Sequence, residues 1–126
     1  MASGLTLDAG ALIAAEKQDR AFYVLWKEAL DRRARVTLPA VVLAQVWRGN
    51  SPVIARLLPS CSIEDLDEDT AKAIGVLLGK ARRSDVVDAV VVLGAASRGD
   101  AIVTSDRADI DPLVAAIGAK LRILDL

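Results

Sequence analysis

Histidine is absent from this chain of 126 residues, and cysteine occurs once, at Cys61. A single cysteine permits no disulfide within the chain. Without histidine, a metal site has to be built from oxygen ligands, which suit magnesium or manganese better than zinc. A nucleophilic role for Cys61 is disfavoured because no histidine can activate its thiol, so we expect a small buried apolar residue there.

Aromatic residues are also scarce, at 3% of the chain, although 53% of the residues are hydrophobic. The core must therefore be built from Ala, Val, Leu and Ile, which interdigitate well in layered α/β structures. The length is close to that of a common domain, and we expect one domain spanning residues 1–126.

Long apolar runs are missing as well, since no run reaches the roughly 18 residues that a membrane-spanning helix needs. The first seven residues lack the features of a signal peptide, so we expect a cytoplasmic protein without a membrane partner. The formal charge of −1 does not indicate a broadly basic face for nucleic acid. A phosphate-containing substrate would need metal ions and local arginines to offset the carboxylates.

Short apolar runs alternate along the chain with amphipathic segments, which predicts a mostly parallel sheet covered by helices on both faces. The predicted strands are residues 5–7, 35–38, 61–63, 101–104 and 121–126. The predicted helices are residues 9–16, a helix capped by Asp19, residues 39–48, a short helix opened by Ser51 and Pro52, and residues 70–81, 85–98 and 111–118.

The segment 85–98 is ambiguous, because its valines favour a strand while its length and its alanines favour a helix. We predict a buried helix. Asp85 and Asp88 then share its first turn, where carboxylates suit the helix dipole. Asp88 interrupts an apolar run, and an unpaired carboxylate in such surroundings is costly without a partner.

Acidic residues follow two of the predicted strands. Asp8 and Asp106 each lie just after a predicted strand, and ligands of parallel α/β sheets bind beyond the carboxyl ends of the strands. Asp88 can point to the same place, and three carboxylates repel one another unless a cation lies between them. A hard divalent cation fits such a site, and it can activate water for hydrolysis of a phosphodiester.

Four segments carry a resemblance to a known family, in order and spacing: 6–13 (TLDAGALI), 39–49 (PAVVLAQVWRG), 87–89 (VDA) and 102–106 (IVTSD). Together they resemble the PIN-domain ribonucleases of the VapC toxin family of type II toxin–antitoxin systems. The resemblance implies a three-layer α/β/α fold, RNA cleavage dependent on Mg²⁺ or Mn²⁺, a homodimer and inhibition by a small VapB-like antitoxin.

The same resemblance assigns the site residues. Asp8, Asp88 and Asp106 match the metal-binding acids of the family, and Asp85 and Asp109 are possible helpers. On the residues alone, all of these except Asp88 could equally be helix caps.

Gln45 departs from the family pattern, which has glutamate at this position in the catalytic set. A glutamine keeps one carbonyl oxygen but loses a charge, which weakens the hold on a divalent metal. We expect Gln45 to line the same pocket as the aspartates. Three explanations remain open: a weakened or inactive nuclease, a site rescued by Glu16, or a variant made to tolerate expression of a toxic protein.

Four further residues near these motifs have two interpretations each. Arg82 and Arg83 could steer phosphate toward the site, or serve the dipole of the preceding helix. Thr104 and Ser105 could orient substrate or water through their hydroxyls, or simply end the strand.

Three other functions are associated with an acidic pocket on a parallel sheet. A catalytically silent PIN module would bind a protein or RNA partner without cleaving anything, and Gln45 supports that alternative. A phosphoacceptor receiver domain fits less well, because Asp8 stands alone and Arg107 follows Asp106 where a lysine is expected. A haloacid-dehalogenase-like phosphatase would need a second aspartate where the chain has Gly10.

Overall fold

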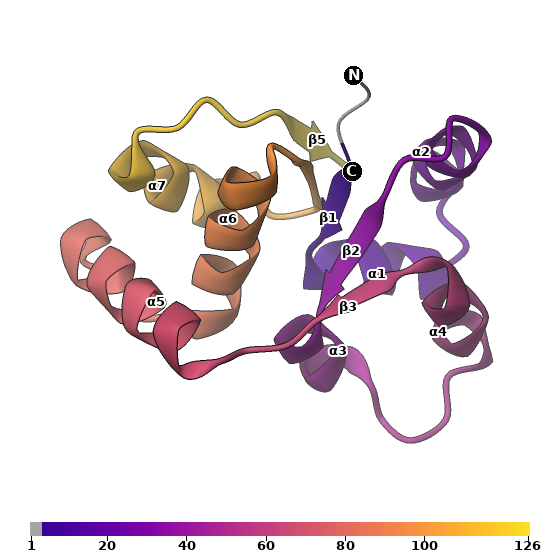
Figure 1. The fold of residues 1–126 in the computed structure, drawn as a ribbon. Coiled ribbons are helices and arrows are strands. Elements are labelled where there is room, and N and C mark those ends of the chain that lie inside the picture. Colours follow the sequence, from indigo (N-terminus) through magenta and orange to yellow (C-terminus); the bar gives the residue numbers. More distant parts are fainter. Residues whose placement is uncertain (1–3) are drawn as a thin grey trace.

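The protein is described here by a computed structural model of residues 4–126. Five parallel strands form one sheet in the order β3-β2-β1-β4-β5 (Figure 1). Their bounds are β1 Leu5–Leu7, β2 Val36–Pro39, β3 Ser62–Glu64, β4 Ala101–Thr104 and β5 Ile123–Asp125. The parallel sheet predicted from the alternating pattern is confirmed.

Helices connect every pair of consecutive strands, with bounds α1 Ala9–Glu16, α2 Arg20–Asp31, α3 Ala40–Val46, α4 Pro52–Leu57, the 3₁₀ turn η1 Leu58–Ser60, α5 Glu68–Ala81, α6 Val86–Arg98 and α7 Arg107–Ile117. Figure 1 shows α5, α6 and α7 grouped on one side of the sheet and α1, α2 and α4 on the other. The predicted three-layer α/β/α architecture is therefore confirmed. Within residues 4–126, no helix is long and apolar enough to cross a membrane.

The core contains almost only aliphatic side chains, as the composition predicts. Phe22 is the one aromatic residue among the largest fully buried side chains, and it contacts the rings of Tyr23 and Trp26. The central strands β1 and β4 are buried along their whole length. Their residues are mostly apolar because helices cover both faces of the sheet at these strands.

Helix α6 resolves the ambiguous segment in favour of a helix. Its N-cap is Asp85, whose side chain accepts a hydrogen bond from the Asp88 backbone amide at 3.0 Å. Its C-cap is Gly99, with a φ of 71° that glycine adopts without a steric penalty. The buried valines that resembled a strand lie between the sheet and α5 and α7.

A buried polar cluster fixes the far end of α6 against β1. Arg98 donates to Asp100 at 3.0 Å and to the Thr6 hydroxyl at 3.0 Å, and Thr6 donates to Asp100 at 2.8 Å. Arg98 also pairs with Glu64 at the end of β3. These charge-assisted bonds set the position of the helix that carries Asp88.

Some predicted boundaries were wrong by several residues. Helix α7 begins at Arg107 rather than at residue 111, and Pro112 lies inside it. Pro112 cannot donate to the carbonyl of Ala108, but the remaining bonds and the buried side chains of Ile110 and Leu113 maintain the helix.

The strand order changes direction beside β1, because β2 and β3 lie on one side of it and β4 and β5 on the other. The carboxyl ends of β1 and β4 therefore form the crevice in which ligands of parallel α/β folds bind. Leu7 pairs with Val103 in the ladder, so the next residue along each chain segment, Asp8 after β1 and Thr104 at the end of β4, lies beside the other.

Candidate functional site

Asp8 is held at the carboxyl end of β1 by hydrogen bonds to both of its oxygens. Oδ1 accepts from the backbone amide of Ala9 at 2.7 Å, and Oδ2 accepts from the Thr104 hydroxyl at 2.8 Å. The side chain is 5% exposed. Asp8 is thus the N-cap of α1, but each carboxylate oxygen still has a free lone pair for a further ligand.

Asp88 is half-buried in the first turn of α6. The pKa of its carboxyl is raised to about 7, first by burial and then by the charges of Asp85, Asp8, Asp109 and Asp106, in that order. The structure therefore brings Asp88 into the electrostatic field of the acids that the sequence proposed as its partners.

Asp106 lies at the start of α7 and is exposed, and its side chain makes no capping bond. Its backbone amide donates to the Thr104 hydroxyl at 3.0 Å, so one hydroxyl contacts both Asp8 and Asp106. The pKa of Asp106 is raised, first by a side-chain hydrogen bond with Asp109 and then by the charge of that residue. Asp106 and Asp109 therefore lie next to each other at the rim of the site.

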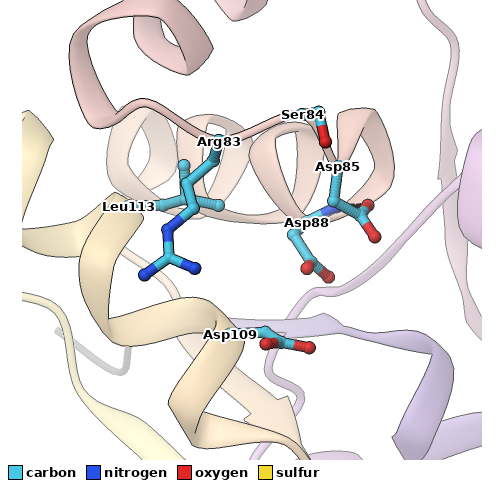
Figure 2. Close-up of a pocket in the computed structure, with 6 residues that line it drawn as sticks. All are labelled: Arg83, Ser84, Asp85, Asp88, Asp109 and Leu113. Atoms are coloured by element: carbon cyan, nitrogen blue, oxygen red, sulfur yellow. Dashed lines mark hydrogen bonds between the residues drawn. The ribbon is translucent and has the colours of Figure 1, made fainter.

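A cavity of about 180 Å³ opens between α6 and α7, lined by Arg83, Ser84, Asp85, Asp88, Asp109 and Leu113. Figure 2 shows the carboxylates of Asp88 and Asp109 projecting into the same space from opposite helices. Arg83 and Leu113 lie at the other end of this cavity from Asp85 (Figure 2).

Several candidate residues are not among those that line this cavity, including Asp8, Asp106, Gln45 and Glu16. Gln45 is exposed in the last turn of α3 and is not among the residues that line it. Glu16 ends α1, about 10 Å along the helix axis from its start beside Asp8. Its carboxylate accepts from Ser51 at 2.8 Å, and rescue of the site by Glu16 is therefore not supported.

The donor set suits a hard divalent cation, because the available atoms are carboxylate oxygens and a hydroxyl, and the two raised pKa values reflect in part repulsion that a cation would relieve. Among residues 4–126, however, no three acidic side chains already lie close enough together to hold one ion. The donor atoms therefore fit a hard cation in their chemistry, although not in their present spacing.

Sequence reasoning left the roles of several residues undefined. From the sequence, Thr104 could have been no more than the end of a strand, yet its hydroxyl donates a hydrogen bond to Asp8 and orients that carboxylate. Gly10 was noted only for lacking a carboxylate, but a Cβ at this position would lie 2.0 Å from Oγ of Ser105. The one sign of this close approach in the sequence is a glycine in the first turn of a helix, where a residue with a side chain is the usual choice.

Cys61 is half-buried beside Leu57, and burial raises the pKa of its thiol to about 11, which disfavours a nucleophilic role.

Searches with protein-family models and among curated proteins return no match. Solved structures do match. A chain of VapBC2 from Rickettsia felis, bound to a DNA fragment from their promoter, has a TM-score of 0.69 and 16% identity over 97% of this chain and 98% of that one. A chain of DNA-bound VapBC from Salmonella typhimurium has a TM-score of 0.69 and 17% identity over 98% of both chains.

PAE2754 from Pyrobaculum aerophilum is also similar, with a TM-score of 0.62 and 18% identity over 96% of this chain and 83% of that one. These likenesses extend over nearly the whole chain at low identity. They show that the chain has the fold that the resemblance to VapC PIN domains predicted.

Proposed function

We propose that this chain is a PIN-domain toxin of the VapC type, a ribonuclease that hydrolyses RNA phosphodiester bonds with Mg²⁺ or Mn²⁺. The observation that carries the proposal is the position of Asp8, Asp88 and Asp106. Asp8 follows β1, Asp88 lies in α6 and Asp106 lies in the loop after β4, where the strand order reverses. The charges of Asp8 and Asp106 raise the pKa of Asp88, and the charge of Asp8 raises the pKa of Asp106. Four ordered motifs and the fold of the VapBC chains support it.

In this proposal Asp8, Asp88 and Asp106 hold the metal. When bound, the cation supplies charge neutralisation and an activated water for attack at phosphorus. Asp8 is the fixed member, since Ala9 and Thr104 orient its carboxylate. Asp88, with a pKa of about 7, can give up its proton near neutral pH when a cation approaches.

Asp85 and Asp109 act as helpers in this scheme. Asp85 is already engaged as the cap of α6, so its contribution is to keep the local charge negative. Asp109 shares a hydrogen bond with Asp106 and holds that carboxyl near the rim until the cation is bound. Gln45 contributes at most a neutral oxygen from α3.

A VapB-like antitoxin is the proposed protein partner, and a homodimer is the proposed assembly. The similar chains of Rickettsia and Salmonella come from VapBC complexes, and a further similar chain comes from FitAB bound to IR36 DNA, with a TM-score of 0.66 and 14% identity over 96% of this chain and 94% of that one. A basic segment of the partner would suit the acidic cavity, because an arginine can replace the charge of the metal.

Regulated expression in a bacterial host tests the proposal. Induction of the chain should arrest growth and change the pattern of total RNA, and Asp8→Asn should do neither. Asp65→Asn, an exposed aspartate outside the site, is the matched control and should remain toxic. Growth that is unaffected by all three proteins at equal expression argues for the alternative, a silent PIN module, which Gln45 favours.

A further inference from the structure

Among residues 4–126, Arg83 is the only cationic residue that lines the acidic cavity. The other lining residues are three aspartates, a serine and a leucine. Its side chain extends along the cavity wall beside Leu113 (Figure 2). None of the ion pairs found within residues 4–126 includes Arg83. The guanidinium therefore shares a cavity with the three aspartates without forming an ion pair with any of them.

The backbone around Arg83 is fixed by the way α5 ends. Arg82 is the C-cap in the left-handed conformation, with a φ of 55°. The Arg83 amide then donates to the carbonyl of Leu78 at 3.0 Å, which closes the last turn of the helix. This turn directs Arg83 into the cavity, whereas the neighbouring Arg82, equal in charge and also exposed, does not line it.

A cluster of carboxylates repels the phosphates of RNA, and a metal ion neutralises only part of that charge. An arginine beside the cluster supplies a planar set of donors that suits phosphate oxygens. We propose that Arg83 contacts a phosphate of the bound RNA next to the acidic residues and so positions the strand for cleavage. This inference rests on the proposed ribonuclease function.

Binding of RNA without cleavage tests the role of Arg83. The probe is a pool of fluorescein-labelled RNA hairpins with randomised loops, titrated with the full chain in Ca²⁺ at several salt concentrations, with RNA integrity checked afterwards by gel. The proteins are the parent chain, Arg83→Gln, Arg83→Lys and Arg82→Gln, which removes the same charge from the adjacent position.

We expect Arg83→Gln to weaken binding about tenfold, and to lower the slope of log K against log salt by about 0.7 through loss of one phosphate contact. Arg83→Lys should recover part of the affinity, because it keeps the charge but loses the planar donors. Arg82→Gln should bind within about twofold of the parent. In cleavage assays, Arg83→Gln should raise KM.

Equal effects of Arg83→Gln and Arg82→Gln would show general electrostatic attraction and overturn the inference. Parental binding by Arg83→Gln, in a chain that cleaves RNA, would also overturn it while leaving the proposed function intact. If the parent chain neither binds the pool nor cleaves RNA in Mg²⁺ or Mn²⁺, the proposed function fails and the inference fails with it. Thermal unfolding of each variant establishes that a loss of binding is not a loss of fold.

Discussion

The hydroxyl of Thr104 donates to Oδ2 of Asp8 at 2.8 Å and accepts from the backbone amide of Asp106 at 3.0 Å. Thr104 is fully buried, and Asp8 is nearly so. One hydroxyl at the end of β4 thus holds the acid of β1 and the start of α7 in fixed positions. The site depends on this residue although Thr104 carries no charge.

Thr104→Val should therefore destabilise the protein by about 1–3 kcal/mol, because it leaves a buried carboxylate oxygen and a backbone amide without their partner. Urea unfolding measures the change in free energy. Thr104→Ser keeps the hydroxyl and is the matched control. Equal stability of the valine and serine variants would contradict the role assigned to this bond.

The pKa of Asp88 predicts how the metal-free protein responds to pH. Since the folded-state pKa is raised from 3.8 to about 7, the folded protein binds this proton more tightly than the unfolded chain does. The resulting stabilisation is fully present below pH 3.8 and is lost as the pH rises through 7. Asp88→Asn, which cannot ionise, avoids that loss.

Thermal unfolding in EDTA tests this prediction. The advantage of Asp88→Asn over the parent chain should grow between about pH 4 and pH 7 and then remain constant. Asp65→Asn, which changes an exposed aspartate outside the site, should show no such trend. An advantage that does not vary with pH would contradict the perturbed titration of Asp88.

Gly10 and Gly75 predict opposite effects of the same substitution. A Cβ at Gly10 would lie 2.9 Å from the backbone nitrogen of Ser105, whereas a Cβ at Gly75 in α5 meets nothing within 4 Å. Gly10→Ala should push α1 away from the β4–α7 connection and destabilise the protein. Gly75→Ala should stabilise it by roughly 0.5–1 kcal/mol, since alanine is the better helix former.

Urea unfolding of both alanine variants provides the comparison. A Gly10→Ala protein as stable as Gly75→Ala would mean that α1 does not approach Ser105 as closely as described. The same variants should also differ in metal binding, because Gly10 follows Asp8 by two residues.

Manganese should raise the unfolding temperature of the parent chain by mass action, because the folded state brings together carboxylates that the unfolded chain does not. Asp88→Asn should show a smaller rise relative to its own EDTA state. Gln45→Glu should show the rise at lower manganese concentration if residue 45 reaches the metal. An identical rise in the parent, Asp88→Asn and Asp65→Asn would indicate non-specific binding.

The sequence predicted the fold because the fold depends on strong local patterns. Buried strands such as β4 are short apolar runs, and their order places the following acids at one edge of the sheet. The helix α6 was predicted despite its valines because its length exceeds that of an ordinary strand.

Other features depend on tertiary contacts that no local pattern encodes. The start of α7 was placed at Asp111 because proline commonly opens helices, yet the packing of Ile110 extends the helix back to Arg107. Glu16 accepts a hydrogen bond from Ser51, a residue 35 positions away, and no local pattern indicates this contact. Likewise, the difference between Arg82 and Arg83 arises from one left-handed residue at the end of α5.

Cleavage of structured RNAs in Mg²⁺ or Mn²⁺ tests the central claim most directly, with the parent chain, Asp8→Asn and Gln45→Glu compared at equal purity and with EDTA controls. The account predicts metal-dependent cleavage that Asp8→Asn abolishes and Gln45→Glu increases. Cleavage by Gln45→Glu alone would show a disabled nuclease whose fold is intact. Failure of all three proteins to cut any RNA would contradict the account and leave a silent binding module.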